Sequence, residues 1–77
     1  MTSKQEFLVE GVVNDIALWL MQEQSLSLQS ALDVVYNSHT FEKLQNSKTG
    51  LYSESSAYNY DLLLSEIKNG RFVQEDF

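Results

Sequence analysis

Only a few side chains in this sequence could perform acid–base or nucleophilic chemistry, and His39 is the first of them. It lies in the run Ser38-His39-Thr40 and could act as a base, because the pKa of a histidine lies near neutrality. A base needs a nucleophile or a substrate proton beside it. The chain has no cysteine, and no serine stands in a nucleophile-elbow pattern. We therefore expect His39 to be a solvated histidine at the start of a helix.

The carboxylates are the second candidate for chemistry. Glu6 and Glu10 are four residues apart and would share one helix face, and Asp61 follows Tyr58 by three residues. A metal site built on helices needs a histidine or further carboxylates in a Glu-x-x-His arrangement, which does not occur here. The three glycines are isolated, so no phosphate-binding loop is present. We expect neither enzymatic activity nor a cofactor nor a metal site.

A better-defined pattern lies on the N-terminal segment, which holds the only tryptophan. Five of its residues are spaced 4, 3, 4 and 3 apart, which is heptad spacing: Phe7, Gly11, Asn14, Leu18 and Met21. Gly11 would let a second helix approach closely, and a central Asn14 resembles the polar residue that fixes the register of a helix pair. Two interpretations stay open. The stripe is an interface for a homodimer or a partner helix, or the helix is central and buries both sides within its own fold.

Aromatic residues form a second candidate surface. Tyr58 and Leu62 are an i, i+4 pair on a flank of their own, and other aromatics accompany them: Tyr36, Phe41, Tyr52 and Tyr60. Tyrosine is enriched at protein interfaces, but it is equally common in cores with its hydroxyl reaching solvent. We include Tyr58 and Leu62 in the candidate interface.

Charge bears on the possible partners. The formal net charge is −6, from 11 acidic and 5 basic residues, and this charge repels phosphates and anionic lipids. The second and third predicted helices have loosely helix-turn-helix spacing, which leaves a DNA-binding regulator as the alternative function. Their cationic and amide donors are few, namely Lys43, Gln45, Asn46 and Lys48, with the only arginine at position 71. We expect no nucleic-acid partner.

Four helices must position these residues. Apolar periodicity predicts helices over about 4–24, 27–37, 39–45 and 54–69, with a short tail over 71–77. Ser3 with Glu6 would form the first capping box, Ser25 or Ser27 and Ser38 or Thr40 would cap the two short helices, and Ser53 the last. Asn69-Gly70 is a stop signal, and Phe72 and Val73 could fold back on the core. The predicted fold is all-α: a small bundle of three to four helices, with the first and last longest and packed antiparallel.

Length and composition agree with a single helical domain. The chain has 77 residues, and 43% of them are hydrophobic, which is enough for one small core. The N-terminus has no basic region before a long apolar run, and the longest apolar run, 16–21, is far shorter than the about 20 residues that span a bilayer. We expect a cytoplasmic protein without a membrane partner.

Three strings of sequence resemble a known family. They are Ala17 to Met21, Ser30 to Ser38, and Thr49 to Tyr52 continued by Ser55, Tyr58, Tyr60, Asp61, Leu62 and Leu63. Together they resemble a domain-of-unknown-function family of short helical proteins from gut and anaerobic bacteria. Ser56 replaces the proline of the family pattern at the start of the last helix. The resemblance covers about residues 5–69 and implies a bacterial, cytoplasmic origin, often with operons of toxin–antitoxin type. It transfers no site residue.

From these patterns we predict a small cytoplasmic module that binds protein through apolar helix faces. An antitoxin-like or accessory partner of a neighbouring gene product is its more specific form, and self-association is another. The candidate interface is Phe7, Gly11, Asn14, Leu18, Met21, Tyr58 and Leu62.

Overall fold

The computed structural model describes residues 2–69 and confirms the all-α prediction. In the described part there are no strands and four α-helices, with two short 3₁₀ turns before the last one: α1 (Ser3–Glu23), α2 (Leu28–Tyr36), α3 (His39–Gln45), η1 (Ser47–Thr49), η2 (Leu51–Ser53) and α4 (Ser56–Lys68). The first and last helices are the longest, with 21 and 13 residues. The predictions about Gly70 and the tail 71–77 lie outside the described residues.

Two of the predicted caps are wrong. Thr2, not Ser3, caps α1, and Gln5 completes the capping box by accepting a hydrogen bond from the Thr2 backbone at 2.8 Å. Ser55, not Ser53, caps α4. Ser53 is used otherwise, because its hydroxyl donates to the Gly50 carbonyl at 2.8 Å and closes the second 3₁₀ turn. At the short helices the caps are Ser27 and Ser38, each one of the two serines or threonines proposed there.

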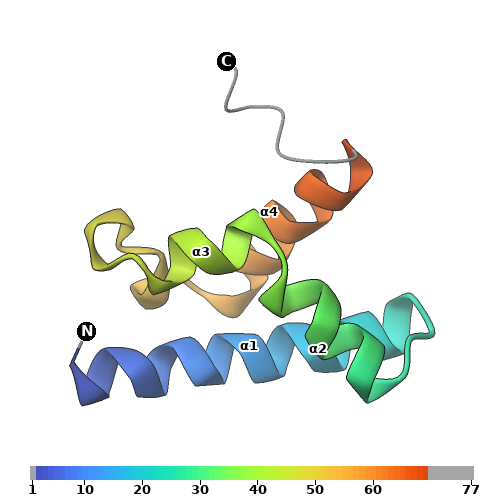
Figure 1. Cartoon of the computed structure of the whole chain (residues 1–77), viewed down its shortest axis with the longest axis horizontal. Coiled ribbons are helices and arrows are strands. Elements are labelled where there is room, and N and C mark those ends of the chain that lie inside the picture. The colour runs from blue at the N-terminus through green and yellow to red at the C-terminus, as the bar shows by residue number, and fades with distance from the viewer. Residues whose placement is uncertain (1, 70–77) are drawn as a thin grey trace.

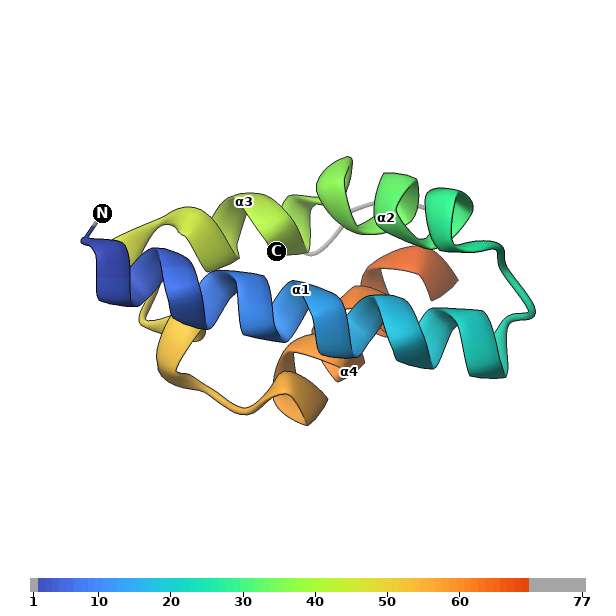
Figure 2. The same cartoon turned by 90° about the horizontal axis from the view of Figure 1, so that it is seen from below.

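The helices follow one another with only two reversals of chain direction. α2 and α3 run back along α1 in a single row, because the two residues between them, Asn37 and Ser38, do not turn the chain around (Figure 1). The segment with the two 3₁₀ turns then makes the second reversal. Figure 2 shows the row of α2 and α3 along one side of α1, with α4 crossing behind α1.

The predicted antiparallel packing of the first and last helices is therefore wrong. At the start of α4, Ser56 donates to Asp15 at 2.6 Å, and one turn later Tyr60 donates to Glu23 at 2.8 Å. The contacts thus advance toward the C-terminus along both helices, so α4 crosses α1 in the same general direction. The antiparallel neighbour of α1 is the row of α2 and α3.

The core lies between α1, the row of α2 and α3, and α4. The buried apolar residues come from every α-helix: Val9, Val12, Val13, Ile16, Ala17, Leu20, Ala31, Val35, Leu44, Tyr60 and Leu63. α1 supplies six of them, so the segment around which the other helices pack is its inner face. Burial of this apolar area is the main stabilising contribution to a domain without cross-links.

Among the buried polar residues, which are Ser38, Thr40 and Asn59, the sequence did not predict Asn59. Asn59 is fully buried, and its amide nitrogen donates to the carbonyls of Leu51 and Ser55, both at 3.1 Å. These bonds join η2 to the first turn of α4. Asn59 therefore holds the second reversal of the chain in place.

Candidate interaction site

The heptad-spaced residues of α1 lie on the side of the helix turned away from the core. Each residue turns a helix by about 100°, so residues spaced 4 and 3 apart form one stripe. Phe7 is 74% exposed and Leu18 is 53% exposed, and Gly11 and Asn14 are exposed as well. Figure 1 shows α1 along the lower edge of the fold, with α3 and α4 above it. We call Phe7, Gly11, Asn14 and Leu18 the outer flank of α1.

The other three candidate interface residues, Met21 of α1 and Tyr58 and Leu62 of α4, lie outside this flank. Met21 is half-buried and packs against the core. Tyr58 and Leu62 are about half a helical turn away from the core residue Tyr60 and so lie on the outward side of α4. Tyr58 is half-exposed and Leu62 is half-buried. The structure thus places the candidate interface residues on two helices, and among these residues Phe7 on α1 has the most exposed apolar side chain.

Gly11 has no role that the fold itself explains. A Cβ built at Gly11 would meet no atom within 4 Å. Glycine within a helix is less stable than alanine by about 0.5–1 kcal/mol. Open space around a destabilising glycine, on an exposed apolar flank, is what a closely approaching second helix would require.

A shallow hollow borders the N-terminal part of the outer flank. It has a volume of about 390 Å³ and lies between α1 and the segment from η2 to the start of α4. Phe7 and Gly11 line one side of it, and Tyr52 and Glu54 are among the residues on the other. The flank is therefore not flat but has a recess on the side of α4.

The ring contacts among the aromatic residues in the described part of the chain are two separate pairs, and only one of them, Tyr36 with Phe41, lies wholly within the predicted aromatic set. The Trp19 and Tyr60 rings are 5.2 Å apart between α1 and α4, while Tyr36 and Phe41 make an edge-to-face contact at 4.9 Å between α2 and α3. Tyr60 is only 6% exposed. Its burial raises the pKa of the Tyr60 phenol to about 12, and the hydrogen bond to Glu23 and the charge of that carboxylate act in the same direction. The pair of Trp19 and Tyr60 therefore belongs to the packing between α1 and α4.

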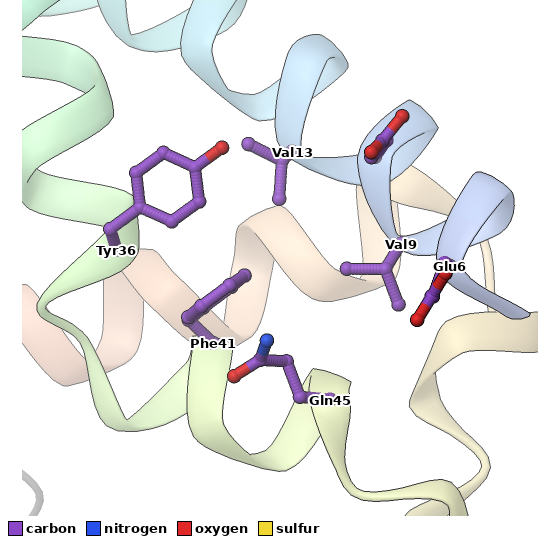
Figure 3. A pocket seen from close by; sticks show the side chains of 7 residues that line it. Glu6, Val9, Val13, Tyr36, Phe41 and Gln45 are labelled. Atoms are coloured by element: carbon purple, nitrogen blue, oxygen red, sulfur yellow. The ribbon is translucent and has the colours of Figure 1, made fainter. Parts of the chain in front are cut away.

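The second pair lines a hollow that the sequence patterns did not predict. It has a volume of about 520 Å³ and lies between the first half of α1 and the junction of α2 with α3 (Figure 3). Its lining residues are Glu6, Val9, Glu10, Val13, Tyr36, Phe41 and Gln45. The i, i+4 spacing of Glu6 and Glu10 was visible in the sequence. Their position opposite two aromatic rings depends on the row formed by α2 and α3, which periodicity did not indicate.

The N-terminus of α3 is occupied by a carboxylate of the same chain. Glu66 of α4 accepts hydrogen bonds from the backbone N–H groups of His39 and Thr40, at 2.9 and 3.0 Å, and from the Thr40 hydroxyl at 2.9 Å. A negative charge at this end of a helix is favourable because of the helix dipole. His39 Nδ1 is 3.4 Å from Glu42. These contacts join α3 to α4 and place two carboxylates around the only histidine.

Other chemistry has no visible site in the described residues. Among residues 2–69, no three His, Cys, Asp or Glu side chains gather as metal ligands would. In the same part of the chain, no helix combines the length and the apolar character needed to cross a membrane. Comparison with protein-family models, curated proteins and solved structures finds no match to this chain. The resemblance to short bacterial helical proteins stays a prediction.

Proposed function

We propose that this chain is a small cytoplasmic protein-interaction module that binds a helix of a partner protein along the outer flank of α1. The observation that supports this proposal most directly is the exposure of Phe7 and Leu18, at 74% and 53%, on a helix whose opposite face is fully buried. Apolar residues scattered singly on a surface need no explanation. These two lie in one stripe with a glycine that has open space around it, as a helix–helix contact requires.

Charge favours a different protein over a second copy of this chain. Glu10 lies on one border of the outer flank and Asp15 on the other, and the whole chain has a net charge of −6. Two copies would bring acidic borders together, and like charges disfavour such a pair. A partner with basic residues beside its apolar stripe would have the complementary charge. An antitoxin-like or accessory role beside a neighbouring gene product is the specific form that we propose.

The test compares two exposed leucines of the same size. Leu18→Glu places a charge on the outer flank, whereas Leu28→Glu does so on α2, where Leu28 is 54% exposed. Both chains are used to capture the purified product of the neighbouring gene. We expect Leu18→Glu to abolish capture and Leu28→Glu to leave it unchanged. Equal capture by both variants would contradict the proposal.

Light scattering on the unmodified chain tests whether a second copy of the chain occupies the outer flank instead. A monomer at tens of micromolar is expected for a module that binds a different protein. A dimer that Leu18→Glu dissociates and Leu28→Glu does not would replace the partner helix by a second copy of the chain, and the outer flank would remain the site.

The DNA-binding alternative has less support from the geometry. A recognition helix presents its N-terminal residues to the duplex, but in α3 the first N–H groups already bind the Glu66 carboxylate. That negative charge would face the phosphates. A salt-sensitive shift of duplex DNA in a gel would nevertheless overturn our choice between the two functions.

A further inference from the structure

We infer that the hollow between α1 and the α2–α3 junction is a binding site for an arginine side chain of the partner protein. The hollow has an apolar floor, because Val9 and Val13 are only 7% and 2% exposed. The aromatic pair forms one wall, and Tyr36 is half-exposed although its ring contacts Phe41. Figure 3 shows the Tyr36 ring across the hollow from Val13. Such a site would cover the aliphatic part of a long side chain.

The charged groups at the hollow are of one sign. Glu6 and Glu10 of α1 line it, both residues are exposed, and no lysine, arginine or histidine is among the lining residues. Gln45 of α3 adds a neutral amide on the facing side. A ligand with a positive charge would therefore gain two carboxylate partners.

The apolar floor, the aromatic wall and the two carboxylates of the hollow together match the parts of an arginine side chain. A guanidinium group can bind carboxylates through paired hydrogen bonds and can also stack on an aromatic ring, while its aliphatic stem covers apolar surface. Lysine matches this arrangement less well, because its ammonium is a more strongly hydrated point charge without a planar face. A phosphate or a carboxylate ligand would be repelled.

The hollow is continuous with the outer flank of α1. Glu10 lies between the two, because it lines the hollow and follows Phe7 by three residues on the same helix. A partner helix on the outer flank could extend one arginine over this edge into the hollow. The inference therefore rests on the proposed function, and it names the side chain through which the partner would be recognised beyond its apolar stripe.

The site is tested directly with a small probe on the full-length chain. N-acetyl-arginine amide is titrated while backbone amide resonances are followed by NMR, and N-acetyl-citrulline amide, which has the same shape without the charge, is the matched probe. We expect saturable shifts centred on Val9, Val13 and Phe41 with the arginine probe alone. Equal shifts with both probes, shifts centred elsewhere, or no shifts would each overturn the inference.

Charge variants separate the hollow from the general acidity of the chain. The double variant with Glu6→Gln and Glu10→Gln should bind the arginine probe at least about tenfold more weakly. The double variant with Glu54→Gln and Asp61→Asn also removes two negative charges, but from exposed positions outside the hollow. It should leave the affinity for the arginine probe nearly unchanged. An equal loss in both pairs would mean that only the net charge attracts the probe.

One further comparison separates failure of this inference from failure of the proposed function. Leu18→Glu should abolish capture of the partner while leaving affinity for the arginine probe unchanged. If the probe binds as expected but capture of the partner is insensitive to Leu18→Glu, the outer flank is wrong and the arginine site stands. If capture depends on Leu18 but the arginine probe does not bind, the flank stands and the arginine site is wrong.

Discussion

The inner and outer faces of α1 are both apolar, yet the fold uses only one of them. Ile16 and Leu20 of the inner face are each 1% exposed, whereas Phe7 and Leu18 of the outer flank are 74% and 53% exposed. An amphipathic helix needs a single apolar stripe to join a small domain. The second stripe on α1 exceeds that need, because the row of α2 and α3 and the single helix α4 cover only the sides that face them. The apolar residues of a helix therefore mark the faces that can be buried, and the number and length of the neighbouring helices decide which of these faces is buried.

The largest expected effect comes from truncating the inner face. Ile16→Ala should lower the free energy of unfolding by about 2–5 kcal/mol, because it removes packed methyl groups and leaves a cavity. Leu18→Ala, on the outer flank, should change the same quantity by no more than about 0.5 kcal/mol. Urea denaturation of both variants, at a concentration where the chain is monomeric, gives the two values. Similar losses in both would mean that the two faces are not different in the isolated chain.

The next effect concerns Tyr60, where the inner face of α1 meets α4. Tyr60→Phe removes the hydrogen bond to Glu23 but keeps the ring against Trp19, and should lower the free energy of unfolding by about 1.5 kcal/mol. The folded pKa of Tyr60 is about 12, against 10.0 for an ordinary tyrosine. The stabilisation is therefore complete below pH 10 and is lost as pH rises toward 12, since the unfolded state releases its proton first.

The measurement for Tyr60 is the difference between two unfolding curves. Chemical denaturation of the natural chain and of Tyr60→Phe is compared at several values between pH 9 and about pH 12. The gap in stability should narrow as pH rises, because only the natural chain contains this phenol. A gap that stays constant to pH 12 would show that the buried hydroxyl is not what joins α4 to the inner face.

Local signals predicted much of the fold. The apolar periods located all four helices, and residues such as Ile16, Val35 and Leu63 are buried as their positions in these periods require. The caps were less certain because serine and threonine are frequent near helix starts. Thr2 caps the first helix in place of Ser3, and Ser55 caps the last helix in place of Ser53. Ser53 is not the cap because its hydroxyl already binds in the turn at Gly50, where φ is 71°.

The direction of α4 could not be read from periodicity. A short break such as Asn37-Ser38 is compatible with a reversal or with a continuing row, and only packing decides between them. The fully buried Asn59 was missed for a related reason, because its partners are the carbonyls of Leu51 and Ser55 in a loop whose path was unknown. For the site, heptad spacing identified Phe7 and Leu18, but the hollow beside Glu6 and Glu10 needed the tertiary fold.

A smaller effect tests the border between the two faces on the side of α4. The Ser56 hydroxyl donates to the Asp15 carboxylate at 2.6 Å, and this contact is exposed to solvent. Ser56→Ala should lower the free energy of unfolding by about 1 kcal/mol or less, since water screens and replaces such a bond. A double-mutant cycle with Asp15→Ala isolates the pairwise energy. If the pair is worth as much as Ile16→Ala, polar contacts at the border, not the inner face, hold α4.

The smallest expected effect has the opposite sign and separates folding from binding. Gly11→Ala should raise the free energy of unfolding by about 0.5–1 kcal/mol, because alanine is the better helix former and its Cβ meets no atom within 4 Å. Gly50→Ala is the matched control. Its Cβ also has open space, but φ is 71°, so alanine there should destabilise the chain. Thermal unfolding of the two variants gives both signs.

Capture of the partner then decides what the glycine at position 11 does. If a helix crosses α1 closely at this point, Gly11→Ala weakens capture although it stabilises the chain that is being captured. A stability gain together with weaker binding would assign the glycine to the contact and the outer flank to the partner. A stability gain with unchanged capture would mean that no backbone approaches Gly11, and the interface would then have to rest on Phe7 and Leu18 alone.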